Sequence, residues 1–250
     1  MKRLELSVVI PVYNEELRVS KALEGAFRYL KAKRITAEIL VVDDGSKDKT
    51  IQVVEKFKDL TTNRMALRVL KHEVNRGKGA AVRTGVLLAK GEIILYMDAD
   101  NATPLTEYEN FRSVLEEGWD VVIGSRAVDR KKVQIHQPLY REAMGRIFNL
   151  LVQLIATPSL WDTQCGFKAF KRKAALDIFP LQTIERFGFD VELLYIARKL
   201  GYSILEAPVR WFDAPGSKVN MVKDSARMAF ELFLIRWNDL KGRYAQRKKS

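Results

Sequence analysis

Short apolar runs alternate with segments of helical spacing in the first half of the chain, and this alternation restricts the fold more than any other feature. Segments with strand character cover residues 6–12, 38–42, 67–70, 93–97 and 121–123. Segments with helical spacing cover residues 15–33, 47–60, 79–90 and 105–117. Several strand segments are continuously apolar, as expected when helices cover both faces of a parallel sheet. The series predicts a doubly wound α/β fold with a mostly parallel sheet flanked by helices.

The regular alternation ends after about residue 126. The second half contains helical patterns at 140–156 and 190–200, a Gly-containing run at 163–170, a strand at 203–211 and a final helix at 221–244. Because no linker rich in Pro, Gly or Ser interrupts the chain, we expect one domain over residues 1–219. A C-terminal helical extension with a basic tail is expected over residues 220–250.

The formal net charge of +12 makes anions the natural partners, whether nucleic acid, phosphorylated metabolites or an acidic membrane surface. Basic residues gather near the end of the chain at Lys241, Arg243, Arg247, Lys248 and Lys249. This tail is expected either to be solvated or to contact a membrane surface. A single cysteine, Cys165, excludes an internal disulfide and suits a reducing compartment.

The apolar segments predict neither a signal peptide nor a membrane span. Charges and a proline interrupt the first residues before a long apolar run develops. The longest nearly uncharged apolar stretch, residues 147–160, is shorter than the roughly 20 residues that cross a bilayer. Such a stretch is still able to lie on a membrane surface.

Acidic side chains collect where three of the predicted strands end. The first strand is followed by Glu15, the second by Asp43 and Asp44, and the fourth by Asp98 and Asp100. In an open parallel sheet, ligands bind beyond the carboxyl ends of the strands, so these tips are expected to line one crevice. Crowded carboxylates repel one another unless a cation, basic side chains or hydrogen-bond donors lie between them.

Asp98 and Asp100 form a candidate metal site. At positions i and i+2 of an extended segment their carboxylates point to the same side, about 6–7 Å apart along the chain. Both are able to bind one Mg²⁺ or Mn²⁺, which prefers one or two carboxylates together with water and phosphate oxygens. A helix cap or simple solvation is the alternative, but the acidic residues at the neighbouring strand end favour the metal.

Neither of the common phosphate-binding glycine motifs is present. The chain has no GxGxxG after its first strand and no GxxxxGK[ST]. The segment Asn75–Gly79, with the sequence NRGKG, is glycine-rich and cationic before a predicted helix. It either approaches a nucleotide phosphate or forms a tight turn with a solvated Lys78.

The motifs, taken together, are similar to those of a known family. The first half resembles the family 2 glycosyltransferases with the GT-A fold in the segments SVVIPVYNEE, EILVVDDGSKDKT, NRGKGAAVRTG, YMDADNAT and VIGSR. The second half looks like the subgroup that loads a sugar onto a polyprenyl phosphate in DTQCGFKAF, RFGFDVELLYIARKLGY and EAPVRWFDAPGSKV. The resemblance covers about residues 6–219 and implies a nucleotide-binding half, about 1–126, and an acceptor half, about 127–219.

The resemblance implies an inverting, metal-dependent transfer of a hexose from a nucleotide sugar to dolichyl or polyprenyl phosphate. The nucleoside pocket would then be lined by Pro11, Tyr13, Glu15, Asp43 and Asp44, with Lys78 beside the base. The segment Asp98, Ala99 and Asp100 would hold Mg²⁺ or Mn²⁺ and the donor diphosphate. Arg126 and Lys218 would supply positive charge near the transferred phosphates.

This chain departs from the mannosyl members of the subgroup at two positions. It has Ala102 where those enzymes carry a metal-binding Gln, so one metal contact would come from water or elsewhere. It has Lys168 at the end of its CGFK segment where they carry an Arg, which resembles the glucosyl members and favours UDP-glucose over GDP-mannose. Lys168 would then be a point charge for the acceptor phosphate rather than a bidentate fork.

Asp162 and Asp190 are the remaining candidates for the chemistry. A phosphate acceptor is largely anionic at neutral pH, so it requires no strong general base. Either aspartate is a candidate for positioning the acceptor or transferring a proton, with Asp162 ahead; a loop cap and a helix N-cap are the alternatives. Cys165 is expected to be a small buried residue rather than a nucleophile.

A lipid acceptor requires contact with a membrane, and two apolar stripes are candidates. The first comprises Tyr140, Met144, Ile147, Phe148, Leu151 and Ile155. The second comprises Val222, Ala226, Phe230, Phe233, Leu234 and Trp237. Each stripe either rests in the headgroup layer, giving peripheral attachment at a cytoplasmic leaflet, or packs on the sheet or in a homodimer.

Three other functions are compatible with parts of the sequence. A glycosyltransferase with another glycan or lipid acceptor keeps the fold and changes the partner. A nucleic-acid-binding module is disfavoured because the basic residues are scattered and the acids lie where nucleic-acid phosphates would bind. A phospho-receiver domain would explain the first half but not the second.

Overall fold

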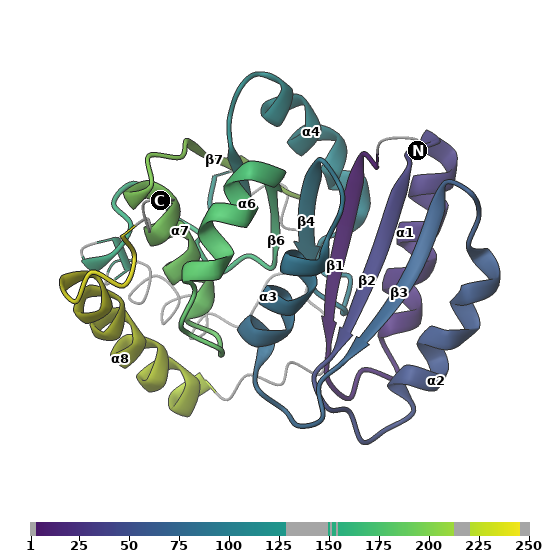
Figure 1. Cartoon of the computed structure of the whole chain (residues 1–250), viewed down its shortest axis with the longest axis horizontal. Helices are drawn as coiled ribbons and strands as arrows, with labels where there is room; N and C mark the ends of the chain where they lie inside the picture. Colours follow the sequence, from purple (N-terminus) through teal and green to yellow (C-terminus); the bar gives the residue numbers. More distant parts are fainter. Residues whose placement is uncertain (1–3, 129–149, 151, 154, 213–220, 246–250) are drawn as a thin grey trace, which may run out of the picture.

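The structure is a computed structural model that describes residues 4–128, 150, 152–153, 155–212 and 221–245. Within these ranges a seven-stranded sheet has the order β3-β2-β1-β4-β6-β5-β7 (Figure 1). The strands are β1 Leu6–Val12, β2 Ala37–Asp43, β3 Met65–Lys71, β4 Ile93–Met97, β5 Val121–Ser125, β6 Phe167–Lys171 and β7 Ile204–Pro208. Strand β6 runs antiparallel to β4 and β5, and the other described pairs are parallel. The predicted mostly parallel α/β sheet is confirmed.

Helices cover both faces of this sheet. They are α1 Val19–Lys33, α2 Thr50–Glu55, α3 Lys78–Leu88, α4 Tyr108–Glu116, α6 Arg172–Ile178, α7 Phe189–Lys199 and α8 Met221–Leu240. Short 3₁₀ helices are η1 Lys56–Leu60, η2 Leu105–Glu107 and η4 Phe179–Leu181. One hydrophobic cluster joins the sheet to α3, α6, α7 and α8, and a second joins the other face to α1 and α4. This double coverage explains why the strands are continuously apolar.

Several boundaries differ from the predicted ones for local reasons. Helix α1 begins at Val19 rather than Glu15, because the carbonyl of Glu15 accepts turn hydrogen bonds from Arg18 and Val19 while its own N–H donates to Thr50 Oγ1. Helix α8 ends at Leu240 rather than near Tyr244. Gly242 adopts a φ of 71°, the left-handed conformation that ends many helices. Most of the helix predicted at 140–156 lies outside the described residues.

Gly85 marks the closest approach of α3 to the sheet. A Cβ atom at Gly85 would overlap Val9 Cγ1 and lie 3.0 Å from Val42 Cγ2. Both valines are fully buried, and β-branched side chains rotate little about χ1. We therefore expect Gly85→Ala to lower the free energy of unfolding by about 1–3 kcal/mol, measured by urea denaturation.

Gly25, inside α1, provides a matched control. Its added Cβ would meet Asn101 Oδ1 at 3.9 Å. Gly25→Ala is expected to leave the free energy of unfolding unchanged or to raise it by up to about 1 kcal/mol, because alanine is the better helix former. Equal unfolding midpoints for the two variants would contradict the close packing of α3.

Candidate functional site

The tips of β1 and β2 are tied together by hydrogen bonds between the two loops that follow them. Asn14 N donates to Ser46 Oγ at 2.8 Å, and Glu15 N donates to Thr50 Oγ1 at 2.6 Å. The buried carboxylate of Asp43 accepts a hydrogen bond from Ser46 N at 3.2 Å. The structure thus brings the predicted nucleoside-lining residues of both strands together, with Pro11 buried and Tyr13 partly exposed.

The tip of β4 joins the same cluster. Hydrogen bonding to Glu15 raises the pKa of Arg18, and the charges of Asp100 and Asp98 raise it further. Burial, together with the charge of Asp98, raises the pKa of Asp100, whose Oδ1 accepts a hydrogen bond from Ala102 N at 3.0 Å. Acidic side chains from the ends of three strands therefore lie close enough to influence the charge of the same groups.

Lys78 forms an ion pair with one of these carboxylates. Its Nζ lies 2.6 Å from Asp98 Oδ1 and 5.9 Å from the centre of the Phe189 ring. Burial alone would lower the pKa of Lys78, but the carboxylates of Asp98, Asp190 and Asp100 raise it, so the ammonium stays charged. The family resemblance implied a position for Lys78 beside the base; in the structure its ammonium contacts the candidate metal ligand Asp98.

Gly166 leaves room for the Asp98 carboxylate. Asp98 N donates to Gly166 O at 3.0 Å, and a Cβ atom on Gly166 would overlap the carboxylate itself. No role was predicted for this glycine. It follows Cys165 in the DTQCGFKAF segment, but only the pairing of β6 with β4 shows which residue it faces.

The donor set at Asp98 and Asp100 fits a hard divalent cation. Two carboxylates are a typical protein contribution to a Mg²⁺ or Mn²⁺ site that keeps water and phosphate oxygens as its other ligands. Lys78 already holds positive charge at Asp98, so the site is built to carry a cation. Among the described residues there is no group of three or more His, Cys, Asp or Glu side chains suited to a metal.

Arg126 and Asp162 form a bidentate ion pair beside the site. Asp162 Oδ2 accepts hydrogen bonds from Arg126 N and Nε, at 2.8 and 2.7 Å, and Oδ1 accepts one from Nη2 at 2.8 Å. The guanidinium carbon lies 5.4 Å from the centre of the Trp211 ring. Burial raises the pKa of Asp162, but the charge and hydrogen bonds of Arg126 bring this pKa below its usual range. Asp162 is buried behind a partly exposed arginine, an arrangement that suits holding the arginine rather than accepting protons.

Lys168 and Asp190 meet inside the fold. Asp190 Oδ1 accepts hydrogen bonds from Lys168 Nζ and Tyr96 Oη, both at 2.5 Å. Lys168 Nζ also donates to Cys165 O at 2.6 Å, and the side chain is 0% exposed. Burial raises the pKa of Cys165 to about 12, so its thiol stays protonated at neutral pH.

The structure therefore separates the predicted site residues into three groups. One group surrounds the strand tips and comprises Pro11, Tyr13, Glu15, Asp43, Asp44, Lys78, Asp98, Ala99 and Asp100. Arg126 and Asp162 lie together as a second group, and Asp190 and Lys168 form a third in the interior. Lys218 lies outside the described residues. Glu206, which accepts hydrogen bonds from the N–H groups of Trp161 and Asp162 at 2.8 Å each, was not predicted.

Comparison with solved structures supports the architecture. Glucosyl-3-phosphoglycerate synthase from Mycobacterium tuberculosis, in complex with Mn²⁺, uridine diphosphate and glucosyl-3-phosphoglycerate, aligns with a TM-score of 0.67 at 20% identity. The alignment covers 94% of this chain and 79% of that one. Mannosyl-3-phosphoglycerate synthase from Rubrobacter xylanophilus aligns with a TM-score of 0.66 at 19% identity, covering 97% and 77%. The predicted GT-A type of fold is confirmed.

Sequence comparison identifies the family. The family model described as Glycosyl transferase family 2 matches residues 7–179. The chain is 37% identical to the dolichyl-phosphate beta-glucosyltransferase of Dictyostelium discoideum, over 95% of this chain and 75% of that protein. It is 37% identical to the protein of the same name from Homo sapiens, over 95% and 76%. These matches show that the chain belongs to glycosyl transferase family 2 and is a glycosyltransferase.

Proposed function

We propose that this protein transfers glucose from UDP-glucose to dolichyl phosphate or a related polyprenyl phosphate, with inversion at the anomeric carbon. The observation that carries the proposal is the 37% identity to dolichyl-phosphate beta-glucosyltransferases across 95% of the chain. Lys168, where the mannosyl members of the subgroup carry Arg, supports glucose over mannose.

The chemistry requires positive charge where the diphosphate leaves. Glycosyl transfer passes through an oxocarbenium-like state while negative charge grows on the departing group. A Mg²⁺ or Mn²⁺ ion held by Asp98 and Asp100 would neutralise that charge as a Lewis acid. Lys78 adds a second charge: once it is displaced from Asp98, its ammonium faces the diphosphate from the start of α3.

Arg126 is the second fixed cation of the proposed site. Among the contacts of the described residues, Asp162 takes the Nε and Nη2 donors, which leaves Nη1 for an anionic ligand. Trp211 and the Asp162 carboxylate hold the guanidinium plane, so little side-chain freedom is lost when a phosphate binds. Asp162 is therefore proposed as a positioning residue.

Lys168 and Asp190 are proposed to act on the site from behind it. Lys168 holds the carbonyl of Cys165, and the next residue, Gly166, lies against the Asp98 carboxylate. Asp190 fixes Lys168 and Tyr96 at the same time. We therefore propose that Lys168 holds Asp98 in position and does not contact the acceptor phosphate directly.

Helix α8 carries an exposed apolar face. Phe230, Phe233, Trp237 and Leu240 are 68%, 64%, 55% and 81% exposed, whereas Leu232 and Ile235 on the other side are buried against the core. The aromatic side chains of this stripe therefore do not pack on the sheet. No helix within the described ranges combines the length and the apolarity needed to cross a bilayer.

We propose that this α8 face rests in the headgroup layer of the membrane that holds the acceptor. Tryptophan favours that layer, and Lys241 lies 4.7 Å from the centre of the Trp237 ring at the start of the basic tail. Lys241 and Arg243 would meet anionic lipid there. The buried free thiol of Cys165 suits a reducing compartment, which supports the cytoplasmic leaflet.

The proposed reaction is tested directly by incubation with radiolabelled UDP-glucose, Mn²⁺ and polyprenyl phosphate in detergent. We expect label in the lipid phase, a loss of transfer on chelation with EDTA, and no transfer from GDP-mannose. Lipid labelling from GDP-mannose alone, or none from either donor, would refute the proposed substrates.

Gly166→Ala tests the Asp98 site. Because the new methyl group displaces the carboxylate, we expect Mn²⁺ affinity in the presence of UDP to fall by about 10–100-fold, measured by titration calorimetry. Gly25→Ala serves as the control and should retain wild-type affinity. Circular dichroism establishes that both variants are folded; a folded Gly166→Ala protein with normal Mn²⁺ affinity would exclude Asp98 as a ligand.

Replacing Phe230, Phe233 and Trp237 together by serine tests the membrane face. We expect the variant to lose flotation with vesicles that contain phosphatidylserine, while Leu60→Ser, at another exposed apolar position, floats like the wild type. Unchanged flotation contradicts the proposal. A wild-type protein that is dimeric in solution and becomes monomeric with the same substitutions would assign the face to a dimer instead.

A further inference from the structure

We infer that His72 and Asp44 are positioning residues of the donor site, which together hold the loop of residues 73–77 and so determine where the start of α3 presents the Lys78 ammonium at this site. The loop joins β3 to α3, and His72 is the residue that follows β3. This inference rests on the proposed function, since it assigns a task within the same donor site. It also gives Asp44 a role other than direct contact with the nucleoside.

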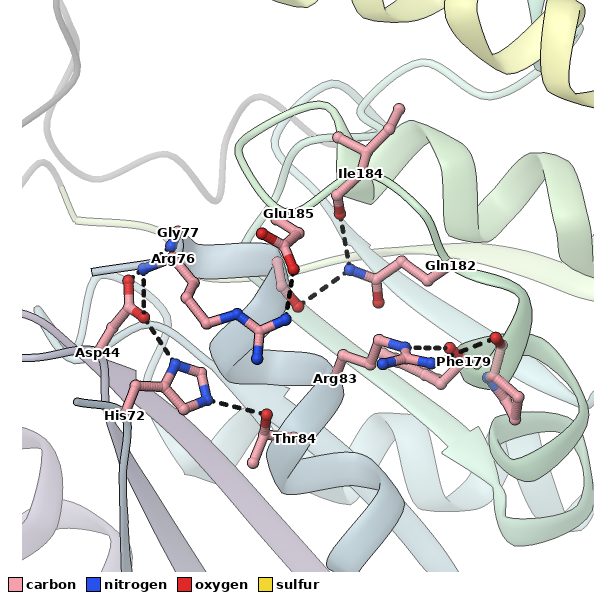
Figure 2. Close-up of polar contacts among 12 residues, drawn as sticks. Asp44, His72, Arg76, Gly77, Arg83, Thr84, Phe179, Gln182, Ile184 and Glu185 are labelled. Atoms are coloured by element: carbon pink, nitrogen blue, oxygen red, sulfur yellow. Dashed lines mark hydrogen bonds and ion pairs between the residues drawn. The ribbon is translucent and has the colours of Figure 1, made fainter. Parts of the chain in front are cut away.

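Both carboxylate oxygens of Asp44 are engaged by the loop. Oδ1 accepts a hydrogen bond from Arg76 N at 3.0 Å and lies 2.8 Å from His72 Nδ1, and Oδ2 accepts one from Gly77 N at 2.7 Å (Figure 2). The Asp44 side chain is only 4% exposed. A buried carboxylate that accepts backbone N–H groups in this way fixes the path of the chain, because each lost hydrogen bond leaves a buried polar group unpaired.

His72 connects this carboxylate to α3. Its Nε2 lies 2.9 Å from Thr84 Oγ1 (Figure 2). Its backbone N donates to Asp43 O at 2.8 Å, which extends the pairing of β3 with β2. A neutral imidazole satisfies both side-chain contacts when Nδ1–H donates to Asp44 and the Thr84 hydroxyl donates to Nε2. The ring is therefore held at both ends, between the strand tip and the helix that Lys78 begins.

Close backbone contacts leave the loop little other freedom. Gly45 has a φ of 77°, and a Cβ there would lie 2.9 Å from Asn75 N. Gly77 has a φ of 121°, and a Cβ there would overlap Glu185 O and lie 2.9 Å from Arg186 Cγ. The loop is thus held between the β2 tip on one side and the segment that contains Glu185 on the other.

The position of the Lys78 ammonium follows from this clamp. Gly77 N is bound by Asp44, and the next residue starts α3 and places its Nζ 2.6 Å from Asp98 Oδ1. Lysine is a flexible side chain, so its placement depends on where the backbone presents it. A shift of about 1 Å at a site of this kind is enough to cost about 100-fold in rate. His72 would therefore affect donor binding without touching the donor.

Acting through Lys78 has a testable consequence, which is non-additivity. If His72 matters only because it places Lys78, then removing the Lys78 ammonium should abolish the effect of changing His72. The variants are His72→Ala, His72→Asn, Lys78→Met and the double variant His72→Ala/Lys78→Met. The asparagine side-chain amide restores a donor near the Nδ1 position and is the conservative rescue.

The binding experiment is titration calorimetry of UDP with Mn²⁺. We expect His72→Ala to weaken binding by about tenfold, His72→Asn to recover most of the loss, and the double variant to bind no more weakly than Lys78→Met. Arg83→Met is the matched control. Arg83 precedes Thr84 on α3 but donates to Phe179 O at 3.0 Å, away from the loop, so its loss should leave UDP binding unchanged (Figure 2). Additive losses in the double variant overturn the inference.

A second measurement needs no ligand. Hydrogen exchange of the Arg76 and Gly77 amides should speed up at least tenfold in His72→Ala relative to Arg83→Met. Unchanged exchange overturns the inference. If the wild type binds UDP and shows these couplings but transfers no glucose to polyprenyl phosphate, the proposed acceptor fails while the role of His72 stands.

Discussion

Repulsion between carboxylates at the carboxyl ends of β1, β2 and β4 is the constraint on which the rest of the structure depends. Each acidic group at this edge has a compensating partner, and the partner determines its role. Lys78 neutralises Asp98, and Arg18 pairs with Glu15. The carboxylate of Asp44 is satisfied by amides of the loop that leads to Lys78. A ligand that brings its own cation must replace Lys78 at Asp98, so donor binding and the movement of this ammonium are linked.

The topology explains why these groups meet at all. Strands β1, β2 and β4 are parallel neighbours, so their loops emerge at one edge, and the apolar faces of the sheet are covered from both sides (Figure 1). Antiparallel β6 then brings Gly166 from the second half to the end of β4. The second half therefore contributes to the site through its backbone as well as through its side chains. Because the sheet beneath the site is rigid, single hydrogen bonds at the strand ends are enough to fix the positions of the site residues.

Much of the fold was predictable because its signals are local. Continuous apolar runs revealed the strands of the first half, and their expected parallel direction placed Asp43, Asp98 and Asp100 at one edge. Periodicity does not reveal which strand a segment pairs with, so the antiparallel course of β6 was not predicted. A lysine is rarely fully buried, and nothing near Lys168 in the sequence indicates that Asp190 will meet it in the core. The role of His72 was missed for the same reason, since Asp44 and Thr84 approach it only after folding.

The ion pairs Lys168–Asp190 and Arg126–Asp162 illustrate how burial separates positioning from binding. Burying the charges of Lys168 and Asp190 away from water costs free energy, even though Tyr96 also donates to the carboxylate. A well-packed pair of apolar residues is often equally stable at a buried position of this kind. Stability alone therefore does not account for the pair. The hydrogen bond from Lys168 to the Cys165 carbonyl, next to Gly166, gives it a role in positioning. Arg126, in contrast, donates from two nitrogens to both oxygens of Asp162 and keeps a third of its side chain exposed, at 34%. We therefore propose the exposed arginine as the group that meets an incoming anion, and the buried lysine as the group that holds in shape the sheet edge that carries Asp98 and Asp100.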